Sequence, residues 1–316
     1  MVTIVSILVQ IIFIIMLAPL VNGVIKKVKA LSEKRWGAPV LQMYYDLYKL
    51  LKKGMVISNI SSWIFRASPW IVFSVNLVAC LFVPISNRFM PLGFQGDLIL
   101  LIYFLVLSKF FTCLAALDAG STFGGMGSSR EVMISAIMEP ALMVSLFTLG
   151  IFARSTSIPE IMLVMQESGG IFAHPGLVLI FLAILPVIMA DTSRLPVDDP
   201  STHLELTMVH EAMILEYSGR YLALMEWGAS IKQLLLILLV LNLFFPHEQL
   251  LGFASIGILL PLSLGLTVLK VILAAIIVGI IEISTIKLRL FSVPNLAALS
   301  FILSFIGFLQ LFVLGR

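Results

Sequence analysis

Charged residues are scarce in this chain, and their scarcity excludes most soluble folds. Of its 316 residues, 12% are charged and 60% are hydrophobic, and the mean hydropathy is +1.11. In soluble domains about a quarter of the residues are charged, and these residues cover the surface. The composition therefore predicts an integral membrane protein.

Cysteine, histidine and catalytic signatures are also scarce. Cys80 and Cys113 fall in apolar runs and form no C-x-x-C pattern, so the chain lacks the usual motifs for an iron–sulfur cluster or an attached haem. His203, His210 and Glu211 lie close together but do not form H-E-x-x-H, and they predict no metal site. The chain has no Walker loop and no G-x-S-x-G motif. We therefore expect no catalytic residues and no redox centre in this chain.

Apolar runs long enough to cross a bilayer make up most of the chain. A spanning helix needs about 20 mostly apolar residues. We predict an all-α polytopic membrane protein in which residues 1–316 form one integral membrane domain. The eight predicted spans are Val5–Ile25, Phe65–Ile85, Leu98–Leu117, Val132–Ala153, Gly176–Ala190, Ile231–Phe245, Leu262–Ile286 and Leu296–Leu314. The fifth and sixth are short, so we expect each to borrow residues from the connection between them.

The distribution of Lys and Arg predicts the orientation, because positive connections stay on the cytoplasmic side. Fifteen of these residues follow spans 1, 3, 5 and 7, and three, Arg88, Arg154 and Arg316, lie on the other side. We expect a cell (inner) membrane location with both termini non-cytoplasmic and a first helix that is retained, not cleaved. The amphipathic segment 26–62 and the acidic segment 191–229 then face the cytoplasm. The net charge of +3 reflects this orientation and predicts no nucleic-acid partner.

Beyond the first two residues of each predicted span, four charged residues fall inside the spans: Lys109, Glu139, Lys270 and Glu282. A charge near the bilayer centre costs at least ~2.5–3.5 kcal/mol, so each one needs a partner, a water-filled cavity or a function. Two interpretations are open. A buried Lys–Glu pair could simply lock two helices together. Alternatively, small movements of a shielded carboxyl relative to a lysine could load and release a proton.

The segment "APVLQMYYDLYKLLKK" predicts an amphipathic helix with a Lys-rich end suited to anionic headgroups. The helix could be a surface anchor, a wall of an entry path for an amphiphile, or a docking surface for a soluble partner. Its two predicted faces are an apolar one, Val40, Leu41, Tyr44, Leu47, Tyr48 and Leu51, and a polar one, Gln42, Asp46, Lys49 and Lys53.

Four separated motifs resemble a known family of membrane subunits. They are "EKRWGAPVLQMYYDLYKLLKKG", "SREVMISAIMEP", "RLPVDDPSTHLELTMVHEAMILEYSG" and "EWGASIKQ". In this order they resemble the membrane subunit shared by formate hydrogenlyase, hydrogenase-4-type (group 4) [NiFe] hydrogenases and respiratory complex I, where it is the H-type subunit, or subunit 1. The similarity runs nearly end to end.

The resemblance implies roles for individual residues. Arg130 and Glu139 match an Arg and a Glu of the fourth span, where the family's Glu belongs to an intramembrane proton path. In the acidic segment, Pro196, Asp198 and Pro200 match the P-F-D-x-P motif of the family, and Glu205 matches a glutamate shortly after it. Glu216, Tyr217 and Ser218 match the family's E-Y-S motif. Glu226 matches the acidic residue that opens the family's sixth span region.

Two candidate sets follow from the intramembrane charges and the resemblance together. The proton-path candidates are Glu139, Arg130, Lys109, Lys270, Glu282, Glu205, Glu211, Glu216 and Glu226. The candidates for partner docking or a quinone-like pocket are Asp198, Asp199, Arg194, Tyr217 and Arg35.

The resemblance is closer to the hydrogenase branch than to complex I. The run "STHLE" leaves only Glu205 where complex I has a denser acidic run, and "WGASIKQ" and "LDAGSTFG" are similar to the hydrogenases. We expect a group 4 [NiFe] hydrogenase or formate-hydrogenlyase-like complex, in which this chain anchors the soluble redox arm and couples electron transfer to proton or Na⁺ translocation. The resemblance implies large and small (iron–sulfur) partner subunits that carry the [NiFe] centre and the clusters, with antiporter-like membrane subunits alongside.

Three alternatives stay open. The chain could be the quinone-binding subunit 1 of an NADH:quinone oxidoreductase-like complex, although the sparse acidic run does not favour quinone. It could also be a stand-alone ion transporter or a passive membrane scaffold.

Overall fold

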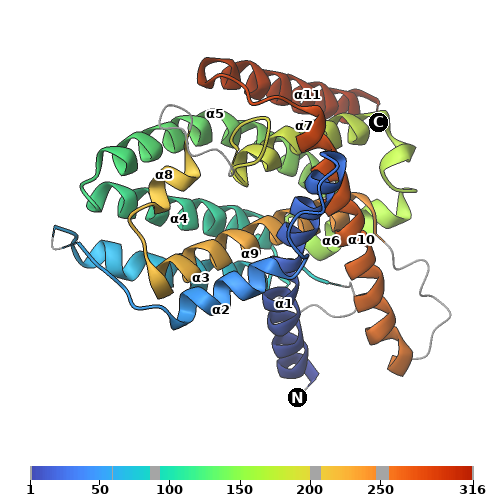
Figure 1. Cartoon of the computed structure of the whole chain (residues 1–316). Helices are drawn as coiled ribbons and strands as arrows, with labels where there is room; N and C mark the ends of the chain where they lie inside the picture. Colours follow the sequence, from blue (N-terminus) through green and yellow to red (C-terminus); the bar gives the residue numbers. More distant parts are fainter. Residues whose placement is uncertain (1, 59, 86–92, 200–207, 247–255, 315–316) are drawn as a thin grey trace.

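The computed structural model describes residues 2–58, 60–85, 93–199, 208–246 and 256–314, and all regular structure in these ranges is helical (Figure 1). This confirms the all-α prediction. A helix occupies each predicted span: α1 (Val2–Ser32), α3 (Trp63–Ala79), α4 (Asp97–Asp118), α5 (Thr122–Ala153), α7 (Pro175–Asp191), α9 (Gly219–Phe244), α10 (Ile256–Ser284) and α11 (Val293–Leu314). Shorter elements are α2 (Gln42–Lys52), α6 (Ile158–Glu167), α8 (His210–Ile214) and the 3₁₀ turns η1 (Ile171–Ala173) and η3 (Leu290–Ser292).

Length separates the helices that occupy the predicted spans. Among the described residues, six helices are long and apolar enough to cross a membrane, namely α1, α4, α5, α9, α10 and α11. Helices α3 and α7 are apolar but have 17 residues each, which corresponds to about 26 Å against ~30 Å of hydrocarbon. The chain is a multi-pass membrane protein, and the total of eight spans stays a prediction.

The two short predicted spans do borrow residues from the acidic connection. Helix α7 ends at Asp191, and α9 already begins at Gly219. Residues 219–229, predicted as part of the cytoplasmic segment, are therefore helical, and Lys232 lies inside a long helix instead of beside its start. A run of apolar residues indicates the middle of a helix but not its polar ends. For this reason the predicted start of the sixth span, Ile231, lies after the observed start of α9.

Helix α9 is the most buried of the long helices, and it crosses the middle of the molecule in Figure 1. Helices α1, α2 and α3 pack against it. Helices α10 and α11 lie at the edges, α10 beside α1 and α11 beside α7. The crossing of α7 and α11 depends on small residues: a Cβ at Gly307 would lie 2.9 Å from the Gly176 carbonyl oxygen, too close for any side chain.

The end of α3 lies inside the protein, where side chains from other helices bind its free carbonyl groups. The Gln10 amide donates to the carbonyls of Cys80 and Val83 at 2.6 and 2.8 Å, and the Asn242 amide donates to the Pro84 carbonyl. Non-helical backbone at membrane depth is tolerated only where protein groups satisfy it. Helices α1 and α9 thus stabilise the end of a helix that is short for a span.

Charged residues of helix α2 border a cavity. Asp46, Lys49 and Lys53 line a cavity beneath the helix, whereas Leu41 and Tyr48 are exposed. Leu47 of the apolar face is buried, so the predicted apolar face is partly buried and partly exposed. Since the cavity wall has many charged groups, charged side chains bordering the cavity keep their hydration, and the exposed apolar residues are free to face an interface.

Candidate functional site

A cavity of about 420 Å³ with many charged groups in its wall opens between helices α1, α2, α3, α4, α5, α8 and α9 and the end of α7. Ligand pockets of this size are mostly lined by apolar side chains with a few polar groups. This wall combines apolar side chains with six basic and five acidic residues, so charged groups are unusually numerous in it. The charged residues are Lys26, Lys49, Lys53, Lys109, Arg194 and Lys232 with Asp46, Glu131, Asp191, Glu211 and Glu226.

Lys109 is the centre of an ion-pair cluster in the cavity wall. Its Nζ contacts Asp191 and lies 3.7 Å from Glu131 Oε1 and 3.9 Å from Glu139 Oε1. The second oxygen of Asp191 lies 2.9 Å from Lys232 Nζ. We call these five residues the Lys109 cluster.

Four helices build the Lys109 cluster. Lys109 comes from α4, Asp191 is the last residue of α7, and Lys232 comes from α9. Glu131 and Glu139, both on α5, are a little over two helical turns apart and so point to similar sides of the helix. An unpaired charge this deep would cost several kcal/mol, so the five side chains stabilise one another.

The Lys109 cluster also borders a second, smaller space of about 10 Å³, which is roughly the volume that one water molecule needs. Lys109 and Asp191 lie in the walls of both spaces. Glu131 lines the large cavity and Glu139 lines the small space. The Glu139 side chain is 33% exposed. The cluster thus lies between the large cavity and the small space.

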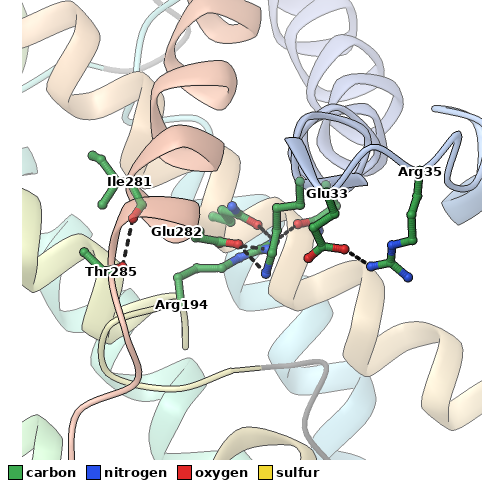
Figure 2. A network of polar contacts seen from close by, with 9 residues as sticks. Glu33, Arg35, Arg194, Ile281, Glu282 and Thr285 are labelled. Carbon is green, nitrogen blue, oxygen red and sulfur yellow. Dashed lines mark hydrogen bonds and ion pairs between the residues drawn. The ribbon is translucent and has the colours of Figure 1, made fainter. Parts of the chain in front are cut away.

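Arg194 forms a second ionic centre (Figure 2). Its Nη1 donates to Glu282 Oε1 at 3.2 Å, and its Nη2 donates to Gln233 Oε1 at 2.9 Å and to Asn22 Oδ1. Lys29 Nζ lies 2.9 Å from the other oxygen of Glu282, whose side chain is fully buried. We call these five residues the Arg194 cluster.

Asp198 forms a third centre at the far end of the same segment. Its carboxylate lies 2.7 Å from Lys287 Nζ and accepts the His210 backbone N–H at 3.1 Å. Two residues earlier, the Pro196 carbonyl accepts the Leu288 N–H at 2.9 Å. Residues 191–198 therefore bind α4, α9, α1 and the end of α10 within eight positions.

The remaining proton-path candidates are placed differently. Glu211 and Glu226 line the large cavity. Arg130 donates to the Met208 carbonyl at 2.8 Å and so binds the middle of the acidic segment, just before α8. Lys270 donates to the Phe245 carbonyl at the end of α9 and lies outside the Lys109 cluster. Glu216 is exposed, and Glu205 lies outside the described residues.

The remaining docking candidates do not gather around the cavity. Arg35 pairs with Glu33 at the exposed surface, apart from Arg194 (Figure 2). The Tyr217 hydroxyl donates to the Phe65 carbonyl at 2.9 Å, and the two rings stack at 4.1 Å. Burial raises the pKa of the Tyr217 hydroxyl above its ordinary value, so it stays protonated. The Asp199 N–H donates to Asp198 Oδ1 at 2.9 Å.

Three members of the Lys109 cluster were missed from sequence. Asp191 was interpreted as the first residue of a loop, and Glu131 as a residue ahead of the fourth span. Lys232, the second residue of the predicted sixth span, was counted with the cytoplasmic connection. One signal was available: Glu131 and Glu139 are eight residues apart, a spacing that brings them to the same side of a helix. Among the described residues, no three His, Cys, Asp or Glu side chains are arranged to hold a metal ion.

The fold and the site together define a class of protein. The chain is a multi-pass membrane protein in which a cluster of paired charges lies between a large cavity and a small internal space.

Comparisons with known proteins show the family. The chain matches the NADH dehydrogenase family over residues 4–313. It is 32% identical over 304 residues to formate hydrogenlyase subunit 4 of Escherichia coli (strain K12), which covers 96% of this chain and 97% of the relative. It is 34% identical over 297 residues to hydrogenase-4 component C of the same organism, covering 94% and 92%. The chain belongs to the NADH dehydrogenase family, and these comparisons confirm the resemblance found in its motifs.

A solved structure shares the fold. A chain of the membrane-bound sulfane sulfur reductase, described as an archaeal respiratory membrane complex, superposes with a TM-score of 0.86 at 20% identity. The match covers 98% of this chain and 99% of that chain. At this identity the likeness shows the common architecture alone.

Proposed function

We propose that this membrane subunit of a complex-I-related complex couples electron transfer in its partners to proton translocation. The host complex is a group 4 [NiFe] hydrogenase or a formate-hydrogenlyase-like complex, because the two full-length relatives belong to a formate hydrogenlyase and to hydrogenase-4. In this proposal the [NiFe] centre and the iron–sulfur clusters lie on large and small subunits docked at the cytoplasmic face. Antiporter-like subunits lie beside the chain in the cell membrane, and both of its termini are non-cytoplasmic.

The position of the Lys109 cluster carries this proposal. Lys109 and Asp191 are shared by the large cavity and the small space, so a proton that reaches Asp191 from one side can leave through Glu139 on the other. An electron arriving in a partner at the cytoplasmic face changes the potential in the cavity. A unit charge about 4 Å away is worth ~4 kcal/mol at an effective dielectric near 20, or about three pKa units. That is enough to move a proton.

The same geometry favours H⁺ over Na⁺ as the ion handled by this chain. A bound metal cation of this kind requires several oxygen ligands around an open position. In the Lys109 cluster that position is filled by Lys109 Nζ, which lies within 3.9 Å of three carboxylates. Translocation of Na⁺, where it occurs, then belongs to the antiporter-like partners.

The test compares two substitutions of the same kind in the assembled complex. Glu139→Gln removes a carboxylate of the Lys109 cluster, and Glu167→Gln, the matched control, removes an exposed one at the end of α6. We expect Glu139→Gln to leave cluster reduction intact but to lower proton transport per H₂ evolved, whereas the control keeps both. Full coupling in Glu139→Gln and in Asp191→Asn would contradict the proposal. Loss of assembly in both would favour a passive scaffold instead.

A further inference from the structure

The Lys109 and Arg194 clusters are linked twice. Asp191 and Arg194 are three residues apart on one short segment, and their partners Lys232 and Gln233 are neighbours on α9. Both Asp191 and Arg194 lie in the wall of the large cavity. A displacement of Arg194 therefore moves the segment that carries Asp191.

The charges of the two clusters complement each other. With all groups ionised, the Lys109 cluster has two lysines against three carboxylates, so its formal charge is one negative. The Arg194 cluster has Arg194 and Lys29 against Glu282, so its formal charge is one positive. Neither cluster is neutral by itself. Buried charge that is not compensated is costly, so each cluster stabilises the ionised state of the other.

Glu282 connects this pair to α10. Its fully buried carboxylate is the acidic partner of Arg194, as Figure 2 shows. The chain just after α10 binds the same segment again, through Lys287 to Asp198 and through the Leu288 N–H to the Pro196 carbonyl. Helix α10 otherwise packs mainly on α1, which supplies Lys29 and Asn22. The position of residues 191–198 therefore depends on where α1 and α10 lie.

We propose that Glu282 is a positioning residue for the Lys109 cluster: it holds Arg194 in the cavity wall, keeps Asp191 between its two lysines and sets the potential in which the cluster exchanges protons. This inference rests on the proposed function and goes further, because it gives Glu282 a role outside the proton path. Glu282 itself takes up no proton in this scheme.

Other ionisable groups surround Glu282 and the Lys109 cluster. Glu282 faces Lys29 of α1 and Arg194. The groups that face the Lys109 cluster across the large cavity are Lys26 of α1, Asp46, Lys49 and Lys53 of α2, His210 and Glu211 of α8, and Glu226 of α9. These groups are common to the wild type and to the variants below, so differences between variants report the Arg194 cluster.

The experiment measures proton transport against pH in the reconstituted complex. Glu282→Gln keeps the shape of the side chain but leaves Arg194 and Lys29 uncompensated, so the positive potential at the Lys109 cluster rises and protonation becomes harder. We expect the pH of half-maximal transport to fall by up to about one unit, less than the about three units that a unit charge about 4 Å away produces at an effective dielectric near 20. Arg194→Gln removes a positive charge and should raise that pH by a similar amount. In the double variant the two changes should cancel.

Opposite shifts of the transport midpoint in Glu282→Gln and Arg194→Gln would show that Glu282 acts through its charge and not by simply keeping the fold rigid. Loosening alone would change transport in the same direction in both variants. A matched control is Thr285→Val, since the Thr285 hydroxyl near Glu282 donates only to the Ile281 carbonyl at 2.8 Å (Figure 2). This control should show no shift. Should Glu282→Gln fail to assemble, Glu282→Asp keeps the charge on a shorter side chain, and we expect lower transport at an unchanged midpoint.

Each outcome decides between the two proposals. Unshifted midpoints in Glu282→Gln and Arg194→Gln, or shifts in the same direction, overturn the positioning role. Normal transport in Glu282→Asp overturns it as well. Full coupling in Asp191→Asn and Glu139→Gln contradicts the proposed function instead. If Asp191→Asn uncouples the complex while Glu282→Gln behaves as wild type, the proposed function stands and only the role of Glu282 fails.

Discussion

The Lys109 and Arg194 clusters are both buried and ionic, but they differ in what surrounds them. Lys109 has three carboxylates within 3.9 Å, and the cluster borders two spaces. Arg194 donates to three fixed acceptors, and its acidic partner is fully buried. A proton relay needs alternative partners and room for water, whereas a structural centre needs every polar atom satisfied. In our proposal this difference is the reason why one buried ionic cluster transfers a proton and the other positions it.

The largest effect is expected where one acid balances two lysines. Asp191→Ala leaves Lys109 and Lys232 without their shared partner, and breaking a buried pair from one side costs about 3–5 kcal/mol. We expect a clear drop in the thermal unfolding midpoint of the complex and a low yield of assembled protein. Glu216→Ala, at an exposed position, is the control. A loss below ~1 kcal/mol, as for a surface pair, would show that the cluster is more hydrated than its burial indicates.

A smaller effect is expected when Asp191 keeps one lysine. Lys232→Met preserves the Lys109 contact but removes the 2.9 Å partner of the second oxygen. Proton transport should fall roughly tenfold, which corresponds to ~1.4 kcal/mol in a barrier, while electron transfer in the partners stays unchanged. Lys26→Met, in the same cavity wall but outside the cluster, should have less effect. Equal losses in the two variants would argue that the total charge of the cavity matters more than the pairing.

A substitution that changes no charge in the Arg194 cluster tests how much its hydrogen bonds stabilise the fold. Asn22→Leu removes the acceptor of Arg194 Nη2 and the donor to the Ser230 hydroxyl. We expect the free energy of unfolding to fall by about 1–3 kcal/mol, the usual cost of losing a hydrogen bond to a charged group. The midpoint of proton transport against pH should stay the same because no charge changes. A shifted midpoint would mean that Asn22 affects the Lys109 cluster by another route.

The smallest effect is expected at Lys29, whose side chain is 22% exposed. Lys29→Met removes one of the two cations around Glu282, but solvent screens the lost charge. We expect a loss of stability of at most ~1 kcal/mol in thermal unfolding and a rise of the transport midpoint smaller than that of Arg194→Gln. A larger shift for Lys29 than for Arg194 would reverse the order in which the two cations act on the cluster.

Several charged residues of the site could be predicted from the sequence one by one, but their ion-pair partners could not. Lys109 and Glu139 were identified because a charge inside an apolar run is costly wherever it lies. Asp191 and Lys232 were missed because hydropathy places a boundary at the first polar residue, whereas the helices continue past it. Glu216 was selected from its motif, and the structure places it at the exposed surface.

The amino-acid sequence alone determined the membrane class, the all-α fold and the family. These properties follow from local sums of hydropathy and from motifs in fixed order, and neither depends on how the helices pack. Tertiary structure alone decided which charges meet: Asp191 with two lysines, and Glu282 with Arg194 and Lys29. The physical reason is that ionic contacts depend on the rotation and depth of helices far apart in the chain, and packing sets both.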